Sequence, residues 1–230
     1  MTSKILIQGA EAIISLNSKN QIEKNRVRKS YRFSLLDKKI RKQRTKSEAK
    51  ILIKASQIIP VPKLISSTEN DLIIEHIKGK KLSEHLDELK NQIQIAEKIG
   101  KQIALLHNNN IIHGDLTTSN MIYVDKNTNN QKDTKNNSLI NNKTQISDNN
   151  SPQFKLYFID FGLSFHSHRS EDFAVDLHLI SQALEAKHFK NHKLLFSSVL
   201  KGYKSISNQA QQVLKRLEKV QSRGRYKTQY

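Results

Sequence analysis

Cysteine is absent from this 230-residue sequence, so the chain can form neither disulfide bonds nor thiolate metal sites. Long apolar runs are absent as well: no stretch approaches the roughly 20 apolar residues that a membrane-spanning helix needs. The first 16 residues contain too short an apolar run to predict a secretory signal, and they include Glu11. These absences predict a cytoplasmic protein that has no membrane partner.

Acidic residues are scarce compared with basic ones. The sequence has 21 Asp and Glu residues against 39 Lys and Arg residues, which gives a formal net charge of +18. A field of this sign attracts polyanions, and nucleic acid is the obvious candidate. The alternative is a genome that encodes Lys, Asn and Ile wherever the fold tolerates them. Clustering of the basic residues favours the first interpretation; the clusters are Arg26, Arg28, Lys29 and Arg32; Arg41, Lys42, Arg44 and Lys46; and Arg223, Arg225 and Lys227.

Hydrophobic residues make up only 36% of the sequence, and residues 125–153 explain part of that low value. This segment has low complexity and consists mainly of Asn, Lys, Asp, Ser and Thr. A segment with so few apolar side chains cannot bury enough surface to offset the entropy lost on ordering. We therefore interpret 125–153 as a disordered loop inserted between two paired strands.

Outside this insert, the hydrophobic periodicity predicts a strand-rich first third with one helix, followed by a mainly helical remainder. Short strands are expected over residues 4–33, with a turn at Gly9. A hairpin is expected across Thr68–Asp71, between two short apolar segments.

Capping-box spacing predicts helix starts at two places, at Ser34 with Asp37 and at Thr45 with Glu48. The IPVP motif at 59–62 then ends the helix, because proline lacks an amide proton and disfavours helix in the preceding residue. Helical spacing returns later in the chain, over residues 82–108, 171–187, 192–203 and 211–220. In the second of these segments the expected apolar stripe is Val175, Leu179, Ile180 and Ala183.

Two short motifs carry the chemistry, HGDLTTSN at 113–120 and IDFG at 159–162. Phosphoryl transfer needs magnesium held by oxygen ligands, a lysine on the phosphates and a carboxylate near the attacking group. Asp160 and Asn120 offer oxygen ligands of this kind. Asp115 precedes Asn120 by five residues, so one tight loop can direct both side chains towards the same place. The motifs therefore predict a site for metal and phosphate.

HGDLTTSN resembles the H-R-D-x-x-x-x-N catalytic loop of protein kinases, and IDFG contains their D-F-G motif. More narrowly, the chain is similar to the small atypical kinases of the KEOPS complex, the PRPK family. The matches cover nearly the whole chain outside 125–153: QGAEA at 8–12, RKSYR at 28–32, RTKSEAKIL at 44–52, HGDLTTSNMI at 113–122, IDFGLS at 159–164, EDFAVDL at 171–177 and RGR at 223–225.

This resemblance implies an α+β, two-lobed, protein-kinase-like fold in a single domain. The N-lobe, residues 1–77, would be small and β-rich with one main helix. The C-lobe, residues 78–222, would be reduced and mainly helical, would contain the insert and would lack a full activation segment. Residues 223–230 would form a basic tail.

The resemblance also implies roles for individual residues. Asp115 would be the catalytic carboxylate, and Asn120 and Asp160 would be the magnesium ligands. Lys24 would anchor the phosphates of ATP and Glu48 would be its ion-pair partner. The other ATP-binding positions would be Gly9, Ala10 and Glu11 in the loop over the phosphates, and Glu75 and Ile77 at the hinge beside the adenine.

Some of these roles have alternatives in the residues themselves. Four other basic residues compete with Lys24, namely Lys19, Arg26, Arg28 and Lys29. Glu48 can instead be a surface capping acid paired with Thr45. For His113 we favour bracing of the loop backbone over metal ligation, and we expect Asp176 to bond the same backbone.

The sequence departs from regulated kinases at three points. QGAEA lacks the usual three glycines, and Gly114 stands where regulated kinases carry an arginine. Only eight residues separate Gly162 from Glu171, which leaves no room for an activation loop. We therefore expect no switching by loop phosphorylation.

The family resemblance implies an ATPase that supports threonylcarbamoyl adenosine formation in tRNA, with autophosphorylation on serine as a side activity. Its cofactors would be ATP and Mg²⁺. Its partners would be the threonylcarbamoyl-transferring subunit, accessory subunits of KEOPS and tRNA, which the basic tail residues Arg223, Arg225 and Lys227 would contact.

Two other functions compete with this one. Aminoglycoside and choline kinases use a similar HGD loop, but they wrap their substrates with extra helices, and only 68 residues follow Gly162 here. A catalytically silent scaffold that binds tRNA and a partner is the second. Retention of Asp115, Asn120 and Asp160 disfavours the scaffold, because binding alone does not need all three.

Overall fold

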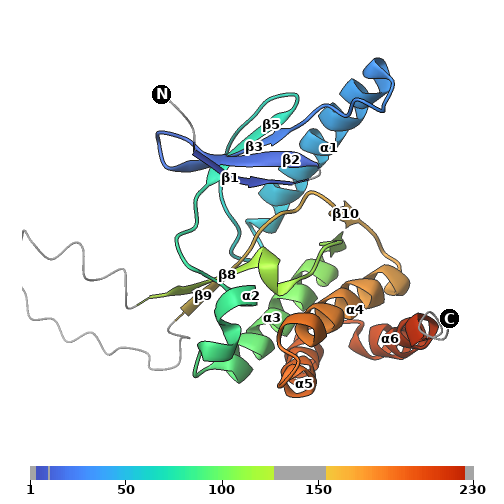
Figure 1. Ribbon diagram of the computed structural model, residues 1–230. Helices are drawn as coiled ribbons and strands as arrows, with labels where there is room; N and C mark the ends of the chain where they lie inside the picture. The colour runs from blue at the N-terminus through green and yellow to red at the C-terminus, as the bar shows by residue number, and fades with distance from the viewer. Residues whose placement is uncertain (1–3, 10, 127–153, 226–230) are drawn as a thin grey trace, which may run out of the picture.

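The computed structural model describes residues 4–9, 11–126 and 154–225 and has an upper and a lower lobe (Figure 1). The upper lobe is a five-stranded antiparallel sheet with the strand order β1-β2-β3-β5-β4, accompanied by one long helix. Its elements are β1 (Lys4–Gln8), β2 (Ala12–Leu16), β3 (Gln21–Arg26), α1 (Ser34–Ala55), β4 (Leu64–Ser67) and β5 (Asp71–Glu75). The hairpin across Thr68–Asp71 and the expected strands up to Arg26 are confirmed, but the extended segment expected to continue to residue 33 is wrong, because β3 ends at Arg26.

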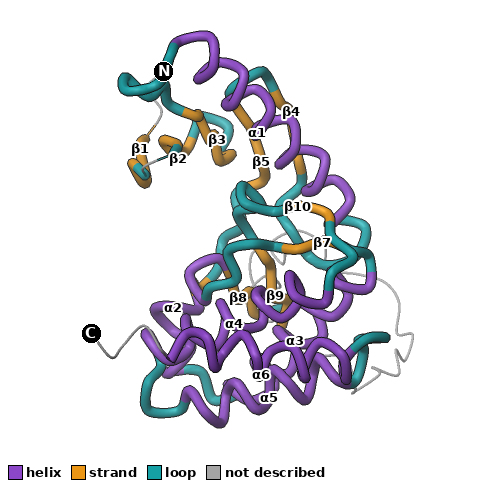
Figure 2. The backbone as a smooth tube through the Cα atoms, turned by 90° about the vertical axis from the view of Figure 1, so that its right-hand side faces the viewer, coloured by secondary structure: helices purple, strands orange, loops and turns teal. Residues whose placement is uncertain are grey.

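The lower lobe is mainly helical and carries two small sheets near the junction of the lobes (Figures 1 and 2). Strands β6, β8 and β9 form one sheet, and β7 pairs with β10 in the other. The elements are β6 (Lys80–Lys81), α2 (Leu82–His85), α3 (Gln92–Asn108), β7 (Ile111–Ile112), β8 (Met121–Asp125), β9 (Phe154–Phe158), β10 (Phe165–His166), α4 (Ser170–Lys187), α5 (His192–Lys204) and α6 (Ala210–Arg225), with 3-10 turns at Leu86–Glu88 and Thr118–Asn120. Among the described residues, no helix is both long and apolar enough to cross a lipid bilayer.

Strands β8 and β9 pair with each other in antiparallel register, with Met121 opposite Phe158 and Asp125 opposite Phe154. This confirms that paired strands flank the insert expected at 125–153. Asp125 itself belongs to β8, and residues 127–153 lie outside the described part of the chain.

Helix α1 is continuous from Ser34, so the helix start expected at Thr45 is wrong. Thr45 is buried in mid-helix, and its hydroxyl donates to the backbone oxygen of Arg41, 2.9 Å away. The box expected at Ser34 is not formed either, because Asp37 accepts from Nε of Arg41 at 2.7 Å. The capping-box spacing therefore predicted a helix here correctly, but neither of the expected capping contacts is formed.

The apolar stripe expected in α4 is partly wrong. Ile180 is fully buried, but Val175 is 38% exposed. The side chains that α4 buries are instead Phe173, Ala174, Asp176, Leu177, Ile180 and Leu184. A buried aspartate inside this stripe hides the helical period from any analysis that counts only apolar residues.

Helices α3 and α5 approach each other closely through two glycines. A Cβ atom on Gly100 would lie 1.9 Å from the backbone oxygen of Val199, and one on Gly202 would lie 2.0 Å from the backbone oxygen of Glu97. Real side chains do not tolerate such distances. The two glycines therefore set the spacing of this helix pair, which supports the loop between α3 and β8.

We predict that Gly202→Ala destabilises the protein. Alanine has the higher helix propensity, by about 1 kcal/mol, but the backbone overlap must separate α3 from α5, at a cost of about 1–3 kcal/mol for overpacking. Ser197→Ala, at an exposed position of the same helix, is the matched control. Thermal unfolding should show a lower Tm for Gly202→Ala than for the control; an equal or higher Tm would contradict the packing argument.

Candidate active site

A cluster of two cations and two carboxylates lies between the lobes. Strand β3 contributes Lys24, whose Nζ lies 2.7 Å from Oε1 of Glu48 on α1. The same Nζ lies 2.7 Å from Oδ1 of Asp160, in the turn after β9. Arg26, two residues further along β3, places Nη2 2.5 Å from Oε2 of Glu48. The side chains of Lys24, Arg26 and Glu48 are each at most 10% exposed, so this pairing takes place largely out of water.

The backbone turn at Asp160 brings its carboxylate to this cluster. Asp160 has φ of +60°, a left-handed conformation that few side chains other than Asn and Asp adopt. Its Oδ1 accepts from the backbone N–H of Gly162 at 3.1 Å. Phe161 is buried and packs on the ring of His113, with centroids 4.8 Å apart. Phe161 thus fixes the inner side of the turn while Asp160 meets Lys24.

The pKa of Asp160 lies below its ordinary value. Burial acts to raise this pKa, but the charge and hydrogen bond of Lys24, aided by the N–H of Gly162, outweigh burial. The carboxylate is therefore ionised at neutral pH, as a metal ligand must be.

Asp115 and Asn120 meet within one loop. The side-chain nitrogen of Asn120 donates to Oδ2 of Asp115 at 2.8 Å and to the backbone oxygen of Asp115 at 3.0 Å. This use of the nitrogen leaves the Asn120 Oδ1 as the atom that can face a cation. The backbone of Asn120 also accepts from the N–H of Ile159 at 2.9 Å, which ties this loop to the segment that carries Asp160.

Asp176 of α4 holds the start of this loop, as the sequence predicted. Its two oxygens accept from the backbone N–H groups of His113 at 2.7 Å and Gly114 at 2.9 Å. His107 of α3 adds a third contact, with Nε2 3.3 Å from Oδ2 of Asp176, and its Nδ1 pairs with the hydroxyl of Tyr203 at 3.0 Å. The contributions of His107 and Tyr203 were not predicted from the sequence.

His113 braces the loop rather than facing a metal. It is fully buried, with Nε2 3.2 Å from the backbone oxygen of Ile159 and Nδ1 3.3 Å from the backbone nitrogen of Asp115. Burial lowers the pKa of His113, against the opposing charge of Asp176, so the ring is neutral near pH 7. A neutral ring can accept at Nδ1 and donate at Nε2, which matches both contacts.

Gly114 is placed where no arginine fits. It has φ of +77°, and a Cβ atom there would lie 2.5 Å from the backbone oxygen of Leu163. The replacement of the regulatory arginine by glycine therefore follows from close contact between two backbone segments.

The residues present fit a magnesium site. Within the described residues no group of three or more His, Cys, Asp or Glu side chains could hold a metal ion by itself. Magnesium is commonly held by one or two protein oxygens together with substrate phosphates and water. Asp160 offers one anionic oxygen and Asn120 one neutral oxygen, which is a donor set of that kind.

The residues predicted to bind nucleotide lie in two places, the β1–β2 turn and the end of β5 with the link that follows it. Gly9 and Glu11 lie in the β1–β2 turn, and Ala10 lies outside the described residues. Glu11 pairs with Arg44 of α1 at 2.5 Å, so its carboxylate is engaged on the helix side. Glu75 and Ile77 lie at the end of β5 and in the link to the lower lobe, where a hinge is expected.

Part of the first two basic clusters is engaged in ion pairs within the chain. Arg26 is buried on Glu48, so within the first cluster it is not available to a polyanion. Ion pairs also engage Arg32 and Arg41 with Asp37, Arg44 with Glu11 and Lys42 with Glu69.

The third cluster is only partly a tail. Helix α6 continues to Arg225, and Arg223 pairs with Glu171 of α4 at 2.8 Å. Arg216 of α6 pairs with the same carboxylate. Lys227 lies outside the described residues.

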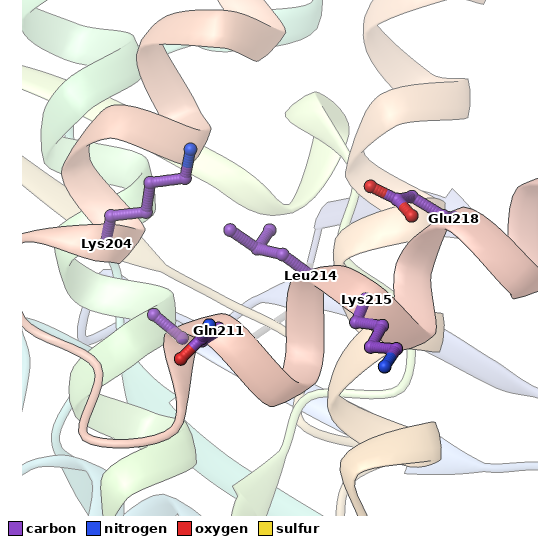
Figure 3. A pocket seen from close by; sticks show the side chains of 6 residues that line it. Lys204, Gln211, Leu214, Lys215 and Glu218 are labelled. Carbon is purple, nitrogen blue, oxygen red and sulfur yellow. The ribbon is translucent and has the colours of Figure 1, made fainter.

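An open pocket of about 620 Å³ lies between the end of α5 and α6 (Figure 3). Its lining residues are Lys204, Ala210, Gln211, Leu214, Lys215 and Glu218. None of them belongs to the charged cluster or to the loop of Asp115, so this pocket takes no part in the chemistry described above.

Comparison with known proteins agrees with this geometry. A family profile for the RIO domain matches residues 12–129. The KEOPS complex subunit Bud32 of Pyrococcus abyssi is 34% identical over 240 aligned residues, which cover 97% of this chain and 96% of that protein. The corresponding subunit of Encephalitozoon cuniculi is 37% identical and is covered to 93%.

A longer relative and a solved structure complete the comparison. A probable bifunctional tRNA threonylcarbamoyladenosine biosynthesis protein of Methanobrevibacter smithii is 34% identical, but this chain spans only 37% of its length. The Rio2 kinase of Chaetomium thermophilum, solved as an ADP/Mg²⁺–phosphoaspartate complex, has a TM-score of 0.58 at 14% identity, with 97% of this chain and 71% of that chain covered. At that identity the likeness shows the fold alone, which is protein-kinase-like as expected.

We predict that Asp176→Ala destabilises the protein by about 2–4 kcal/mol, because two buried N–H groups of the loop would lose their acceptor. Glu185→Ala, at an exposed position of the same helix, is the control. Chemical denaturation measures both free energies of unfolding. Equal values for the two variants would show that Asp176 does not support the loop.

Proposed function

This chain belongs to the RIO domain family and, within it, to the Bud32 family of KEOPS complex subunits, and we propose that it is a magnesium-dependent ATPase and atypical serine/threonine kinase that supports tRNA modification. The observation that carries the proposal is the pairing of Lys24 with both Glu48 and Asp160, each at 2.7 Å. A scaffold that only binds partners has no need for a buried lysine shared by two carboxylates from different lobes.

In this proposal each polar group of the site has a distinct task. Lys24 contacts the phosphates of ATP, and Glu48 holds Lys24 in place. Asp115 orients the attacking water or hydroxyl and accepts its proton. The hydrogen bond from Asn120 fixes the direction of the Asp115 carboxylate.

Asp160 and Asn120 would hold the magnesium ion. When bound, magnesium neutralises charge on the phosphate oxygens and orients them for transfer. The low pKa of Asp160 supports this assignment, because the carboxylate is available in its charged form.

The short segment after the site favours water, or a serine of the chain itself, over a bound peptide as phosphoryl acceptor. Strand β10 begins three residues after Gly162, and α4 begins at Ser170. This leaves no platform of the kind on which regulated kinases bind peptides. Hydrolysis of ATP is therefore proposed as the main activity, with autophosphorylation as a side reaction.

The partners proposed are those that the relatives' names suggest. They are the threonylcarbamoyl-transferring subunit, the accessory subunits of KEOPS, and tRNA. The net charge of +18 supports contact with RNA. The candidates for phosphate contact near the C-terminus are Arg223, Arg225 and Lys227, and Arg223 is shared with Glu171.

We predict that Asp160→Ala abolishes magnesium-dependent ATP hydrolysis and leaves the protein folded, since Asp160 supplies the anionic metal ligand. Turnover should be measured for the protein alone, then with its transferase subunit, and then with tRNA added. Glu84→Ala, which removes an exposed carboxylate of α2 in the lower lobe, is the control. Turnover that is unchanged by Asp160→Ala would favour the scaffold over the enzyme.

We predict that the double substitution Arg225→Gln with Lys227→Gln weakens tRNA binding. The slope of log affinity against log salt should decrease by about 1–2, because each lost phosphate contact changes it by about 0.7–0.9. Lys215→Gln with Lys219→Gln, at exposed positions of α6, removes the same charge and is the control. Identical curves for the two double variants would remove the C-terminal residues from RNA binding.

A further inference from the structure

We propose that Arg26 is a positioning residue that holds Glu48 independently of Lys24, so that Glu48 stays in place to hold Lys24 when Lys24 turns from Asp160 to the phosphates of ATP. The inference rests on the proposed function, because it concerns the same site. It adds a residue to the lysine–glutamate pair that the protein-kinase pattern contains.

The contacts of Arg26 are those of a buried clamp. Its side chain is 5% exposed, and Nη2 lies 2.5 Å from Oε2 of Glu48, while Lys24 occupies Oε1. The glutamate therefore has one cation on each oxygen. Both cations come from the same strand at positions two apart, which places their side chains on the same face of β3.

Charge balance explains why two cations are needed. In this structure Lys24 is shared between Glu48 and Asp160. When ATP and magnesium bind, the phosphates compete for Lys24. If Lys24 were the only partner of Glu48, sharing its charge with the phosphates would leave a carboxylate that is 6% exposed only partly compensated, and an under-compensated buried charge is costly. Arg26 removes that cost because its ion pair with Glu48 does not depend on Lys24.

The backbone of Arg26 is anchored on both sides, which keeps the clamp in place. Its N–H donates to the backbone oxygen of Asn70 at 3.0 Å. Its carbonyl oxygen accepts from Nη1 of Arg41 at 3.4 Å, and Nε of Arg41 donates to Asp37 at 2.7 Å. Strand β3 is thus joined to α1 at two levels, one near the start of the helix and one at Glu48.

The guanidinium nitrogen that pairs with Glu48 also faces the metal turn. A Cβ atom on Gly162 would lie 3.4 Å from Nη2 of Arg26. The Nε of Arg26 is buried, and no partner for it is found among the described residues. An unpaired donor so close to the site raises the alternative that Arg26 touches the nucleotide directly, and the experiment below separates that alternative from positioning through Glu48.

The test is a double-mutant cycle with Arg26→Met and Glu48→Gln, with Arg26→Lys as the conservative variant. In the complex with the transferase subunit and tRNA, Arg26→Met should lower kcat for ATP hydrolysis about tenfold and change KM for ATP less than about threefold. Arg26→Lys should restore part of kcat. In the Glu48→Gln background, Arg26→Met should lower kcat by a further twofold at most, because the group through which Arg26 acts is gone.

A second measurement does not depend on activity. In the nucleotide-free protein, hydrogen exchange of the amides around Glu48 should be faster in Arg26→Met than in the wild type. If Arg26→Met does not fold, Arg26→Lys takes its place in the same cycle, since it keeps the charge and loses the forked geometry.

Three outcomes would overturn the inference. They are an unchanged kcat in Arg26→Met, an equal loss of kcat in the Glu48→Gln background, and unchanged exchange around Glu48. The second of these would show direct contact with the nucleotide. Failure of the proposed function would be detected separately, because Asp160→Ala would then leave ATP turnover unchanged. In that case the hydrogen-exchange measurement would still test whether Arg26 holds Glu48 of α1 in place.

Discussion

The ion pairs of Lys24 with Glu48 and with Asp160 join parts of the chain that are 24 and 136 residues apart. The buried charges of Lys24 and Glu48 are stable only when each has its partner in the correct geometry. The positions of β3, of α1 and of the turn after β9 are therefore mutually dependent. Since Lys24 and Glu48 belong to the upper lobe and Asp160 to the lower one, the same charges also fix how the two lobes meet, and a site at their junction follows from this arrangement.

The lower lobe stabilises its buried aspartate by a different route. Asp176 is compensated by two backbone N–H groups and by His107 rather than by a formal cation from Lys or Arg. Because the carboxylate accepts at Nε2 of His107, the Nδ1 of that ring is left to accept from Tyr203. Burial raises the pKa of Tyr203 to about 12, with a smaller opposing hydrogen bond from Ser207, so the hydroxyl keeps its proton and can donate. Three helices thereby hold the backbone of His113 and Gly114 in place.

Much of this arrangement was predictable from the sequence, because local motifs encode it. The loop of Asp115 and Asn120, the turn at Asp160 and the helix that carries Glu48 all have local signatures, and the structure brings Lys24 to Glu48 as the kinase resemblance implied. The tasks proposed for these residues remain predictions. Arg26 was grouped with the basic cluster because a basic residue on a strand gives no sign of its burial; only its spacing of two from Lys24 pointed inward. Likewise, Val175 was placed in the apolar stripe of α4 because the stripe was drawn through apolar residues alone, whereas the buried face includes Asp176.

The contact at Gly114 leads from this geometry to regulation. An arginine at this position would combine a left-handed backbone with overlap of its Cβ and the backbone oxygen of Leu163, so the residue that receives an activation-loop phosphate in other kinases has no place here. The eight residues between Gly162 and Glu171 are too few to carry such a phosphate back to the site. Lys24 nevertheless contacts both Glu48 and Asp160 without any phosphorylated loop. Control of the proposed ATPase would therefore have to act on nucleotide access or on the attacking group, both at the junction of the two lobes.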